Sequence, residues 1–153
     1  MKITVGIPAF NEEKNIIHII EKLQKKTDVI IVCDDGSTDK TGEIAKKMGA
    51  IVITHESNLG YGAAIRSLFL KARELKSDML VTLDSDGQHR IEDLLPVTKP
   101  IIEKQADMVI GSRFLEGNQE NIPKYRKVGI KIITKLANSS LEESVTDSQS
   151  GFR

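Results

Sequence analysis

The chain has 153 residues, the size of one ordinary domain with its own core. Its 22 basic residues balance 22 acidic ones, and this zero net charge argues against a nucleic-acid binder. The single cysteine, Cys33, excludes an internal disulfide and fits a reducing compartment. No apolar run approaches the roughly 18 residues of a membrane span, so we expect a soluble, cytoplasmic chain whose membrane contact is at most peripheral, at the cytoplasmic face.

Short apolar runs alternate along the chain with longer amphipathic segments, which is typical of a parallel sheet covered by helices. The pattern loosens after Arg113. In chain order, the predicted strands are Ile3–Ile7, Val29–Cys33, Ile51–Thr54, Met79–Leu83 and Met108–Ile110.

Helical periodicity fills the segments between these strands. The first helix is predicted from Ile16, Ile19, Ile20 and Leu23, which share one face, with Asn11 as its N-cap. Apolar residues with the same spacing, Ile65, Leu68, Phe69 and Ala72, predict another helix. Further helices are predicted at Lys40–Met48, Pro96–Gln105 and Lys124–Leu136.

Four of the predicted strands end in polar residues or in glycine and proline. The clusters are `PAFNEE` after Ile7, `DDGSTD` after Cys33, `DSDGQH` after Leu83 and `GSR` after Ile110. In an open parallel sheet, ligands bind beyond the carboxyl ends of the strands, where the strand order reverses. The four clusters are therefore expected to line one cleft.

Asp84 and Asp86 stand one residue apart after the fourth predicted strand, where an unpaired charge would be costly to bury. Gly87 favours a turn that lets both carboxylates converge on one hard cation, and the Gln88 carbonyl offers a third oxygen. Mg²⁺ or Mn²⁺ is typically held by one or two carboxylates together with substrate phosphates. The alternative is a solvated turn that caps a short helix near Ile91, but the companion clusters favour the metal site.

Asp34 and Asp35 follow the second predicted strand, and adjacent carboxylates repel each other unless a donor-rich partner occupies the site. A nucleotide base or ribose offers such donors. The alternative is that the whole cluster opens a helix, because Ser37, Thr38 and Asp39 are ordinary cap residues. We expect Asp39 to act as a cap in either case.

Gly60-Tyr61-Gly62, between a strand and a helix, suggests a dinucleotide-binding loop. The G-x-G-x-x-G pattern would need glycine where Ile65 stands, and the glycines follow the third strand instead of the first. The pattern therefore disfavours a Rossmann dehydrogenase. We interpret the glycines as a tight entry into the helix, with a backbone close to the ligand.

Arg113 follows the last predicted strand, and its guanidinium suits a diphosphate or phosphate oxygen. The alternative for Arg113 is a surface salt bridge. His18 lies on an amphipathic helix and His55 ends a strand, so both are expected to be structural. Cys33 lies inside an apolar run and is expected to be a plain buried thiol.

With `IPAFNEE`, `DDGSTD`, `NLGYGAA`, `DSDGQH` and `GSR` in this order, the sequence resembles the family 2 inverting glycosyltransferases of the GT-A fold. Within them it is most similar to the polyprenyl-phosphate sugar transferases, such as the dolichyl-phosphate mannose synthases. The resemblance implies an α/β, Rossmann-like, mostly parallel sheet with helices on both faces. It also implies one catalytic domain over residues 1–153, a partly flexible acceptor-side segment 114–153, and a family chain that continues beyond `SGFR`.

The resemblance also implies roles for individual residues. The nucleotide base and ribose would lie against Pro8, Ala9, Asn11, Glu12 and Asp35. Asp84, Asp86 and Gln88 would hold Mg²⁺ or Mn²⁺ against the donor diphosphate. Arg113 would contact a phosphate, so that Asp86 and Arg113 are the expected catalytic residues.

The implied reaction moves a sugar from a UDP- or GDP-linked donor to a polyprenyl or dolichyl phosphate. The basic helix Lys124–Leu136 either approaches anionic lipid headgroups or is a solvated basic face. The alternatives on this fold are a transferase for a polysaccharide or protein acceptor and a sugar nucleotidyltransferase. From another class, the alternative is a nucleotide-binding module without turnover, and the oligomeric state stays open.

Overall fold

The computed structural model describes residues 1–87, 91–112, 124–139, 145–148 and 150–153, with the backbone alone for 124–128 and 136–137. The chain groups into two compact units, Met1–Leu94 and Leu95–Arg153. The expectation of a single domain over residues 1–153 stays a prediction. In the described part of the chain, none of the helices combines the length and the apolar character needed to cross a bilayer.

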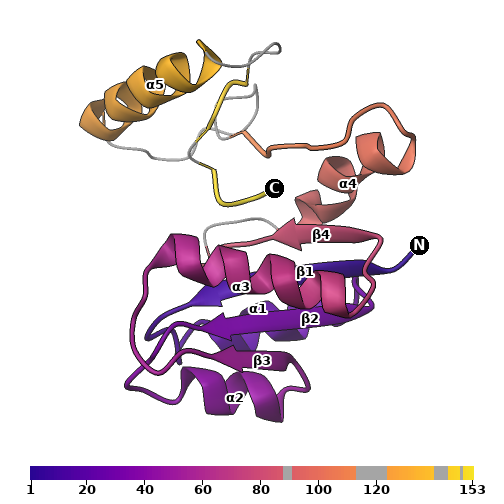
Figure 1. The fold of residues 1–153 in the computed structure, drawn as a ribbon, viewed down its shortest axis with the longest axis vertical. Coiled ribbons are helices and arrows are strands. Elements are labelled where there is room, and N and C mark those ends of the chain that lie inside the picture. Colours follow the sequence, from indigo (N-terminus) through magenta and orange to yellow (C-terminus); the bar gives the residue numbers. More distant parts are fainter. Residues whose placement is uncertain (88–90, 113–123, 140–144, 149) are drawn as a thin grey trace. The chain divides into compact units, whose positions relative to one another are not determined.

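The first unit is built on a parallel sheet of four strands in the order β3-β2-β1-β4 (Figure 1). In chain order, the strands are β1 (Ile3–Ala9), β2 (Val29–Asp34), β3 (Ile51–Thr54) and β4 (Met79–Thr82). Successive strands step outward from β1 to β3, and β4 then pairs with the opposite edge of β1, where Thr4 lies across from Leu80. This reversal creates the switch point, between β1 and β4, at which α/β proteins bind ligands.

Helices cover both faces of this sheet, as predicted. α1 (Ile16–Leu23) and α2 (Thr41–Lys47) contact each other on one face, and α3 (Tyr61–Glu74) packs across β1 and β2 on the other (Figure 1). Crossovers between parallel strands are almost always right-handed, and this rule places helices on opposite faces when the sheet grows first toward β3 and then toward β4. The α/β class with a parallel sheet and helices on both faces is confirmed.

The first helix buries the predicted face but begins later than predicted. Ile16, Ile19, Ile20 and Leu23 are all buried. Asn11 is not the N-cap: the cap position is Asn15, because the Glu12 carbonyl accepts hydrogen bonds from the N–H groups of Asn15 (3.0 Å) and Ile16 (2.9 Å) and forms a turn first. Asn11 is left in the preceding loop, with a φ of 56°.

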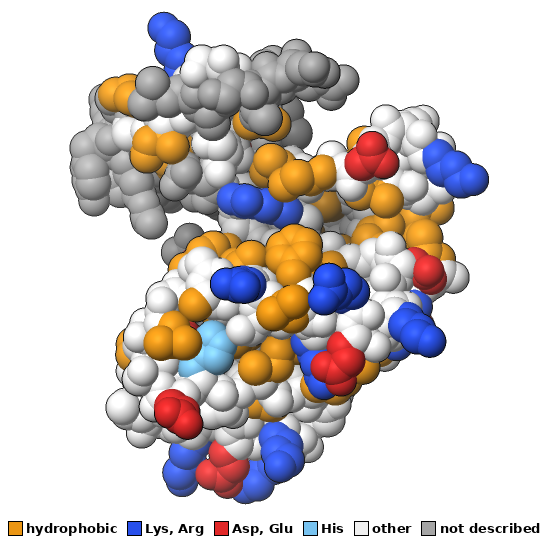
Figure 2. All heavy atoms as spheres, in the orientation of Figure 1, with side chains coloured by type: hydrophobic (Ala, Val, Ile, Leu, Met, Phe, Trp, Pro, Cys, Tyr) orange, Lys and Arg blue, Asp and Glu red, His pale blue; other side chains and the backbone are white. Residues whose placement is uncertain are grey.

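The third helix is rotated relative to the predicted face. Phe69 was expected in the core, but it is 58% exposed. Small side chains of α3 bring this helix close to β2. Successive residues of an α-helix are rotated by about 100° around the helix axis, so Phe69 points away from the sheet when Leu68 points into it. Over α3, hydrophobic side chains lie among Lys and Arg (Figure 2). The core cluster between α3 and β2 comprises Ile31, Cys33, Ala64, Leu68 and Ala72.

In the rest of the chain, a short 3-10 helix (Ile91–Asp93) leads into α4 (Leu94–Ile102), and α5 spans Lys124–Asn138. The predicted helices in these two segments are confirmed, although α4 ends earlier than predicted. On α5, Lys131 and Lys135 are exposed, whereas the side chains of the other predicted basic residues, Lys124, Arg126 and Lys127, lie outside the described ones.

The predicted strand Met108–Ile110 is wrong, because the backbone there forms no strand. A strand requires successive ladder bonds to a neighbour. Instead, the next residue along the chain, Gly111, donates its backbone N–H to the carbonyl oxygen of Phe152 (2.8 Å). The segment therefore packs against the `SGFR` end of the chain, in which Phe152 is buried.

Candidate functional site

A cleft of about 340 Å³ opens in the first unit at the carboxyl ends of the strands, within the range of small-molecule sites. It contains most of the predicted site residues: Pro8, Ala9, Glu12, Asp35, Asp84 and Asp86. The other lining residues are Phe10, Asn58, Tyr61, Ala64 and Ser85. The residues come from the ends of β1, β2 and β4, from the loop before α3 and from α3 itself, so three of the four predicted clusters, those after Ile7, Cys33 and Leu83, converge within this unit.

Three predicted site residues are not part of this lining as described. Asn11 is next to the cleft in sequence but does not line it. Gln88 and Arg113 lie outside the described residues. Their predicted roles, like those of the lining residues toward a nucleotide, stay predictions.

Asn11 instead ties the β1–α1 loop to the β2–α2 loop. Its backbone N–H donates to the Ser37 hydroxyl (2.9 Å), and its side-chain oxygen accepts from the backbone N–H of Thr38 (2.8 Å). The backbone N–H of Glu12 donates to the hydroxyl of Thr41 (2.8 Å). These reciprocal bonds fix the loop that carries Glu12 at the edge of the cleft.

Asp39 strengthens the same junction, but it is not the N-cap of α2 that the sequence predicted, because that position is Lys40. Its carboxylate accepts from the backbone N–H of Thr41 (2.9 Å), the first residue of α2, and from that of Glu13 (3.1 Å). Burial alone would raise the pKa of Asp39. The hydrogen bonds from Thr41 and Glu13 outweigh it and hold the pKa below its usual value.

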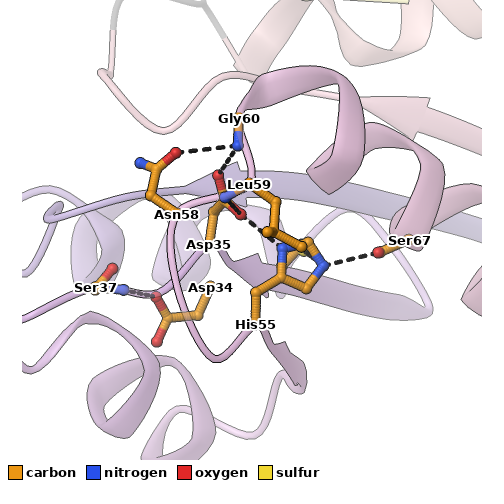
Figure 3. A network of polar contacts seen from close by, with 9 residues as sticks. Asp34, Asp35, Ser37, His55, Asn58, Leu59, Gly60 and Ser67 are labelled. Carbon is orange, nitrogen blue, oxygen red and sulfur yellow. Dashed lines mark hydrogen bonds and ion pairs between the residues drawn. The ribbon is translucent and has the colours of Figure 1, made fainter.

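The two adjacent carboxylates at the end of β2 are both buried and accept hydrogen bonds from donors within the protein (Figure 3). Asp34 accepts from the backbone N–H of Ser37 (3.0 Å). Asp35 accepts from His55 Nδ1 (2.6 Å) and from the backbone N–H groups of Leu59 (3.0 Å) and Gly60 (2.8 Å). Burial alone would raise the pKa of Asp35, but these three donors and the charge of His55 lower it below its usual value.

His55 is held from both sides of its ring. Nδ1 contacts Asp35, and Nε2 lies 2.9 Å from the Ser67 hydroxyl of α3 (Figure 3). Nε2 also lies 3.6 Å from the Cys33 sulfur. Burial and then the negative charge of Asp35 raise the pKa of the Cys33 thiol to about 11. Cys33 is therefore a neutral, buried thiol at physiological pH, as predicted from its apolar run.

Asp84 and Asp86 both reach the cleft, and Gly87 follows them with a φ of 74°, the turn expected from the sequence. The Tyr61 hydroxyl donates to Asp84 Oδ1 (3.1 Å). Among the described residues, no group of three or more His, Cys, Asp or Glu side chains lies close enough together to hold a metal ion without other ligands. Two carboxylates facing an open cleft fit Mg²⁺ or Mn²⁺, which take oxygen ligands and complete their shell with substrate phosphates and water.

Comparison with known protein families decides the family. The model of glycosyl transferase family 2 matches residues 4–153. The chain belongs to this family.

Several members of the family are similar over nearly the whole chain. A UDP-N-acetylglucosamine–dolichyl-phosphate N-acetylglucosaminyltransferase from Methanococcus voltae is 39% identical over 96% of this chain and 66% of its own length. A dolichyl-phosphate hexose transferase from Haloferax volcanii is 33% identical over 99% of this chain and 64% of its own length. The chain thus spans slightly less than two thirds of each relative.

The fold of this chain is also similar to that of solved structures. Glucosyl-3-phosphoglycerate synthase from Mycobacterium tuberculosis, in complex with Mn²⁺, UDP and glucosyl-3-phosphoglycerate, superposes with a TM-score of 0.54. It is 33% identical, and the match covers 65% of this chain and 39% of the synthase. This likeness agrees with the GT-A, Rossmann-like fold predicted from the sequence.

Sequence reasoning missed several lining residues, above all those of the β3–α3 segment. Asn58 and Tyr61 line the cleft, and Phe10 and Ser85 lie beside residues that were predicted. The signal was present, because `HESNLGYG` follows the third predicted strand and the strand-end rule applies to it equally. The glycines were interpreted as a helix entry, which they are, since Gly60 directly precedes α3 with a φ of 91°.

Proposed function

We propose that this family 2 domain transfers a sugar from a UDP- or GDP-linked donor to a polyprenyl or dolichyl phosphate, with Mg²⁺ or Mn²⁺. One observation carries the proposal: residues at the end of β1, Asp35, Asp84 and Asp86 line a single cleft at the switch point of the sheet. The names of the two dolichyl-phosphate transferases support the lipid acceptor. The complex of the mycobacterial synthase with UDP and Mn²⁺ supports the donor and the metal.

The donor base and ribose would lie between the β1 loop and α3. Pro8, Ala9 and Phe10 offer apolar and aromatic surface to the cleft, and Tyr61 adds an aromatic ring. Flat apolar walls with a few placed polar groups are typical of sites for ring-shaped ligands. Glu12 and Asp35 supply acceptor oxygens at the same cleft, although Asp35 already accepts three hydrogen bonds from the protein.

Asp84 and Asp86 would hold the metal, with Gln88 as a further oxygen ligand. The bound ion would offset the negative charge that develops on the leaving diphosphate. The carboxylate of Asp84 is oriented by the Tyr61 hydroxyl, which restricts how this ligand can rotate. Arg113 would contact a phosphate, where its planar guanidinium suits two oxygens.

The reaction would be a single in-line displacement. An oxygen of the acceptor phosphate attacks the anomeric carbon, the bond from this carbon to the diphosphate oxygen breaks, and the configuration inverts. The acceptor phosphate is already ionised at neutral pH, so the chain needs no strongly basic residue at this point. The site would therefore work by orienting donor and acceptor and by stabilising charge.

A lipid acceptor places the reaction at a membrane surface, and we propose the cytoplasmic face. The exposed Lys131 and Lys135 of α5 carry charge of the sign that anionic headgroups attract. Liposome association of the chain, compared with a variant in which both lysines are replaced by glutamine, tests this part separately. Equal association of the two proteins would refute a role for these lysines.

The donor site is tested by calorimetric titration of the chain with UDP and with GDP, each with and without Mn²⁺. We expect one nucleotide to bind only in the presence of Mn²⁺, and chelation of the metal to release it. Asp86→Asn keeps the shape of the side chain but removes its charge, so the binding of the nucleotide to this variant should no longer be strengthened by Mn²⁺. Unchanged metal dependence in this variant would show that the assignment of Asp86 is wrong.

Transfer is tested with the nucleotide sugar of the base that binds, a polyprenyl phosphate and Mn²⁺. We expect a glycosylated lipid phosphate of inverted anomeric configuration. Metal-dependent binding of the nucleotide without transfer to this acceptor would instead favour a binding module, or a transferase for another acceptor.

A further inference from the structure

The β3–α3 loop is fastened to the sheet by one buried carboxylate. Asp35, at the end of β2, accepts the backbone N–H groups of both Leu59 and Gly60, the two residues directly before α3. Its Oδ1 bonds Leu59 and its Oδ2 bonds Gly60, so both bonds depend on the rotation of the carboxylate group. Anything that fixes this rotation also fixes where the loop ends and where α3 begins.

His55 fixes the rotation of Asp35. Its Nδ1 lies 2.6 Å from Asp35 Oδ1, the shortest of the three contacts to this carboxylate. The His55 side chain is 11% exposed, and its Nε2 is anchored on the Ser67 hydroxyl at 2.9 Å (Figure 3). Because Nδ1 faces a carboxylate, the proton of the neutral ring belongs on Nδ1, and Nε2 then accepts from Ser67.

The loop held in this way leads directly to the cleft. Tyr61 is the first residue of α3, follows the anchored Gly60, and donates its hydroxyl to Asp84 Oδ1 (3.1 Å). Asn58 of the same loop also lines the cleft. Hydrogen bonds therefore connect Ser67 to His55, His55 to Asp35, and Asp35 to Leu59 and Gly60. The backbone continues from Gly60 to Tyr61, whose hydroxyl bonds Asp84, one of the two carboxylates proposed to hold the metal.

We infer that His55 is a positioning residue for the nucleotide and metal site, acting through Asp35 on the β3–α3 loop and so on Tyr61 and Asp84. The inference rests on the proposed function, because it assigns His55 to the same cleft. It revises the expectation that His55 is merely structural.

The Asp35–His55–Ser67 arrangement has the connectivity of a hydrolytic triad, but its position argues for a different use. Ser67 lies in the middle of α3 and not among the residues that line the cleft. Backbone N–H groups inside a helix bond within the helix, so they are not available to stabilise an oxyanion beside this hydroxyl. In contrast, Asp35 lines the cleft, and the loop that it bonds carries two further lining residues, Asn58 and Tyr61.

Two substitutions of His55 separate its two contacts. His55→Asn keeps a donor near the position of Nδ1 and loses the contact with Ser67, whereas His55→Gln keeps an acceptor near the position of Nε2 and loses the contact with Asp35. His18→Asn is the matched control, because His18 lies on α1 with its side chain 72% exposed. All of these proteins are prepared as the 153-residue chain.

The first readout is amide hydrogen exchange at Leu59 and Gly60, measured by NMR without any ligand. A hydrogen bond to a charged group is strong enough that its loss should speed exchange about tenfold or more in His55→Gln. His55→Asn should stay within about threefold of the unmodified chain, since its donor to Asp35 remains. His18→Asn should not differ, and the ring nitrogen shifts of His55 should report the Nδ1–H form.

The second readout is the dissociation constant for UDP in the presence of Mn²⁺, with GDP titrated in parallel. We expect the bound nucleotide to be held about tenfold more weakly by His55→Gln and nearly normally by His55→Asn. Faster exchange at Leu59 and Gly60 with unchanged nucleotide binding would overturn the positioning role. So would unchanged exchange, or exchange that rises equally in the β1 and β2 amides, which would assign His55 to general stability.

The two readouts also keep this inference apart from the proposed function. If the unmodified chain bound neither UDP nor GDP with Mn²⁺, the proposed donor site would fail, and with it the link from His55 to catalysis. The exchange data would still decide whether His55 holds the loop through Asp35.

Discussion

Gly36 provides a direct test of how closely the loops around the cleft approach each other. Its φ is +73°, and a Cβ at this position would lie 2.6 Å from the Asn58 nitrogen and 2.7 Å from the Ser57 Cα, besides overlapping the Ser57 carbonyl carbon. These are backbone atoms, which cannot move aside as a side chain would. Gly36→Ala must therefore displace the β3–α3 loop or strain the β2–α2 loop.

The expected loss of stability is the sum of two contributions. A side chain in the left-handed region costs roughly 1–2 kcal/mol relative to glycine, and forcing extra volume into a packed site costs roughly 1–3 kcal/mol. Gly36→Ala should therefore lower the free energy of unfolding by roughly 2–5 kcal/mol. Gly49 is a matched control, because it has a φ of +84° and no atom within 4 Å of an added Cβ. Gly49→Ala should show the first contribution alone.

The assay is equilibrium unfolding in urea followed by far-UV circular dichroism, because the chain has no tryptophan to report by fluorescence. With a typical dependence of about 2 kcal/mol per molar urea, the midpoint of Gly36→Ala should lie about 0.5–1.5 M below that of Gly49→Ala. Equal midpoints for the two variants would refute the close approach of these loops.

Three further predictions follow from buried or paired side chains. Leu68→Ala should lower the free energy of unfolding by about 2–5 kcal/mol, because Leu68 is fully buried between α3 and the sheet, and a loss below about 1 kcal/mol in urea would contradict this packing. The pKa values of Asp35 and Asp39 are both lowered on folding, so their ionised carboxylates stabilise the folded state. This contribution is complete above about pH 4, where the aspartates of the unfolded chain are ionised, and it is lost as the pH falls through the lower pKa values of the folded state. Urea midpoints measured from pH 7 to pH 2 should decline at the acid end, and Asp39→Asn should decline less steeply there than the unmodified chain. Tyr61→Phe removes the donor to Asp84 and should weaken Mn²⁺-dependent nucleotide binding by about 2- to 10-fold without changing the urea midpoint, whereas unchanged calorimetric affinity would show that this hydroxyl does not orient the carboxylate.

Most of the local structure of the first unit was predictable from the sequence. Alternating short apolar runs and helical periodicity predicted all four strands of the sheet, and α1 buries the four residues whose spacing predicted it. The strand-end rule placed Asp84 and Asp86 in the cleft, because parallel strands deliver their carboxyl ends to one edge. These features depend on residues near one another in the chain, or on a rule that holds for every open parallel sheet.

Features that depend on distant partners were not predictable in the same way. The rotation of α3 depends on which small residues meet β2, and periodicity alone did not separate Leu68 from Phe69. The segment Met108–Ile110 has the composition of a strand, but a strand exists only where a neighbour completes its ladder. Asn11 looked like a helix cap, yet its side chain bonds Thr38, 27 residues further along the chain.

By itself, the sequence determined the α/β class, the location of the cleft at the strand ends and the residue types offered there, because these follow from local periodicity and from the chirality of the chain. Only the tertiary structure decided which polar groups of the loops form hydrogen bonds with one another. The role of Asp35 toward a base or ribose stays a prediction, but the sequence did not show that its carboxylate also accepts from His55, Leu59 and Gly60, some 20 to 25 residues away. A buried carboxylate takes the nearest well-oriented N–H groups, and which groups those are depends on how the loops pack.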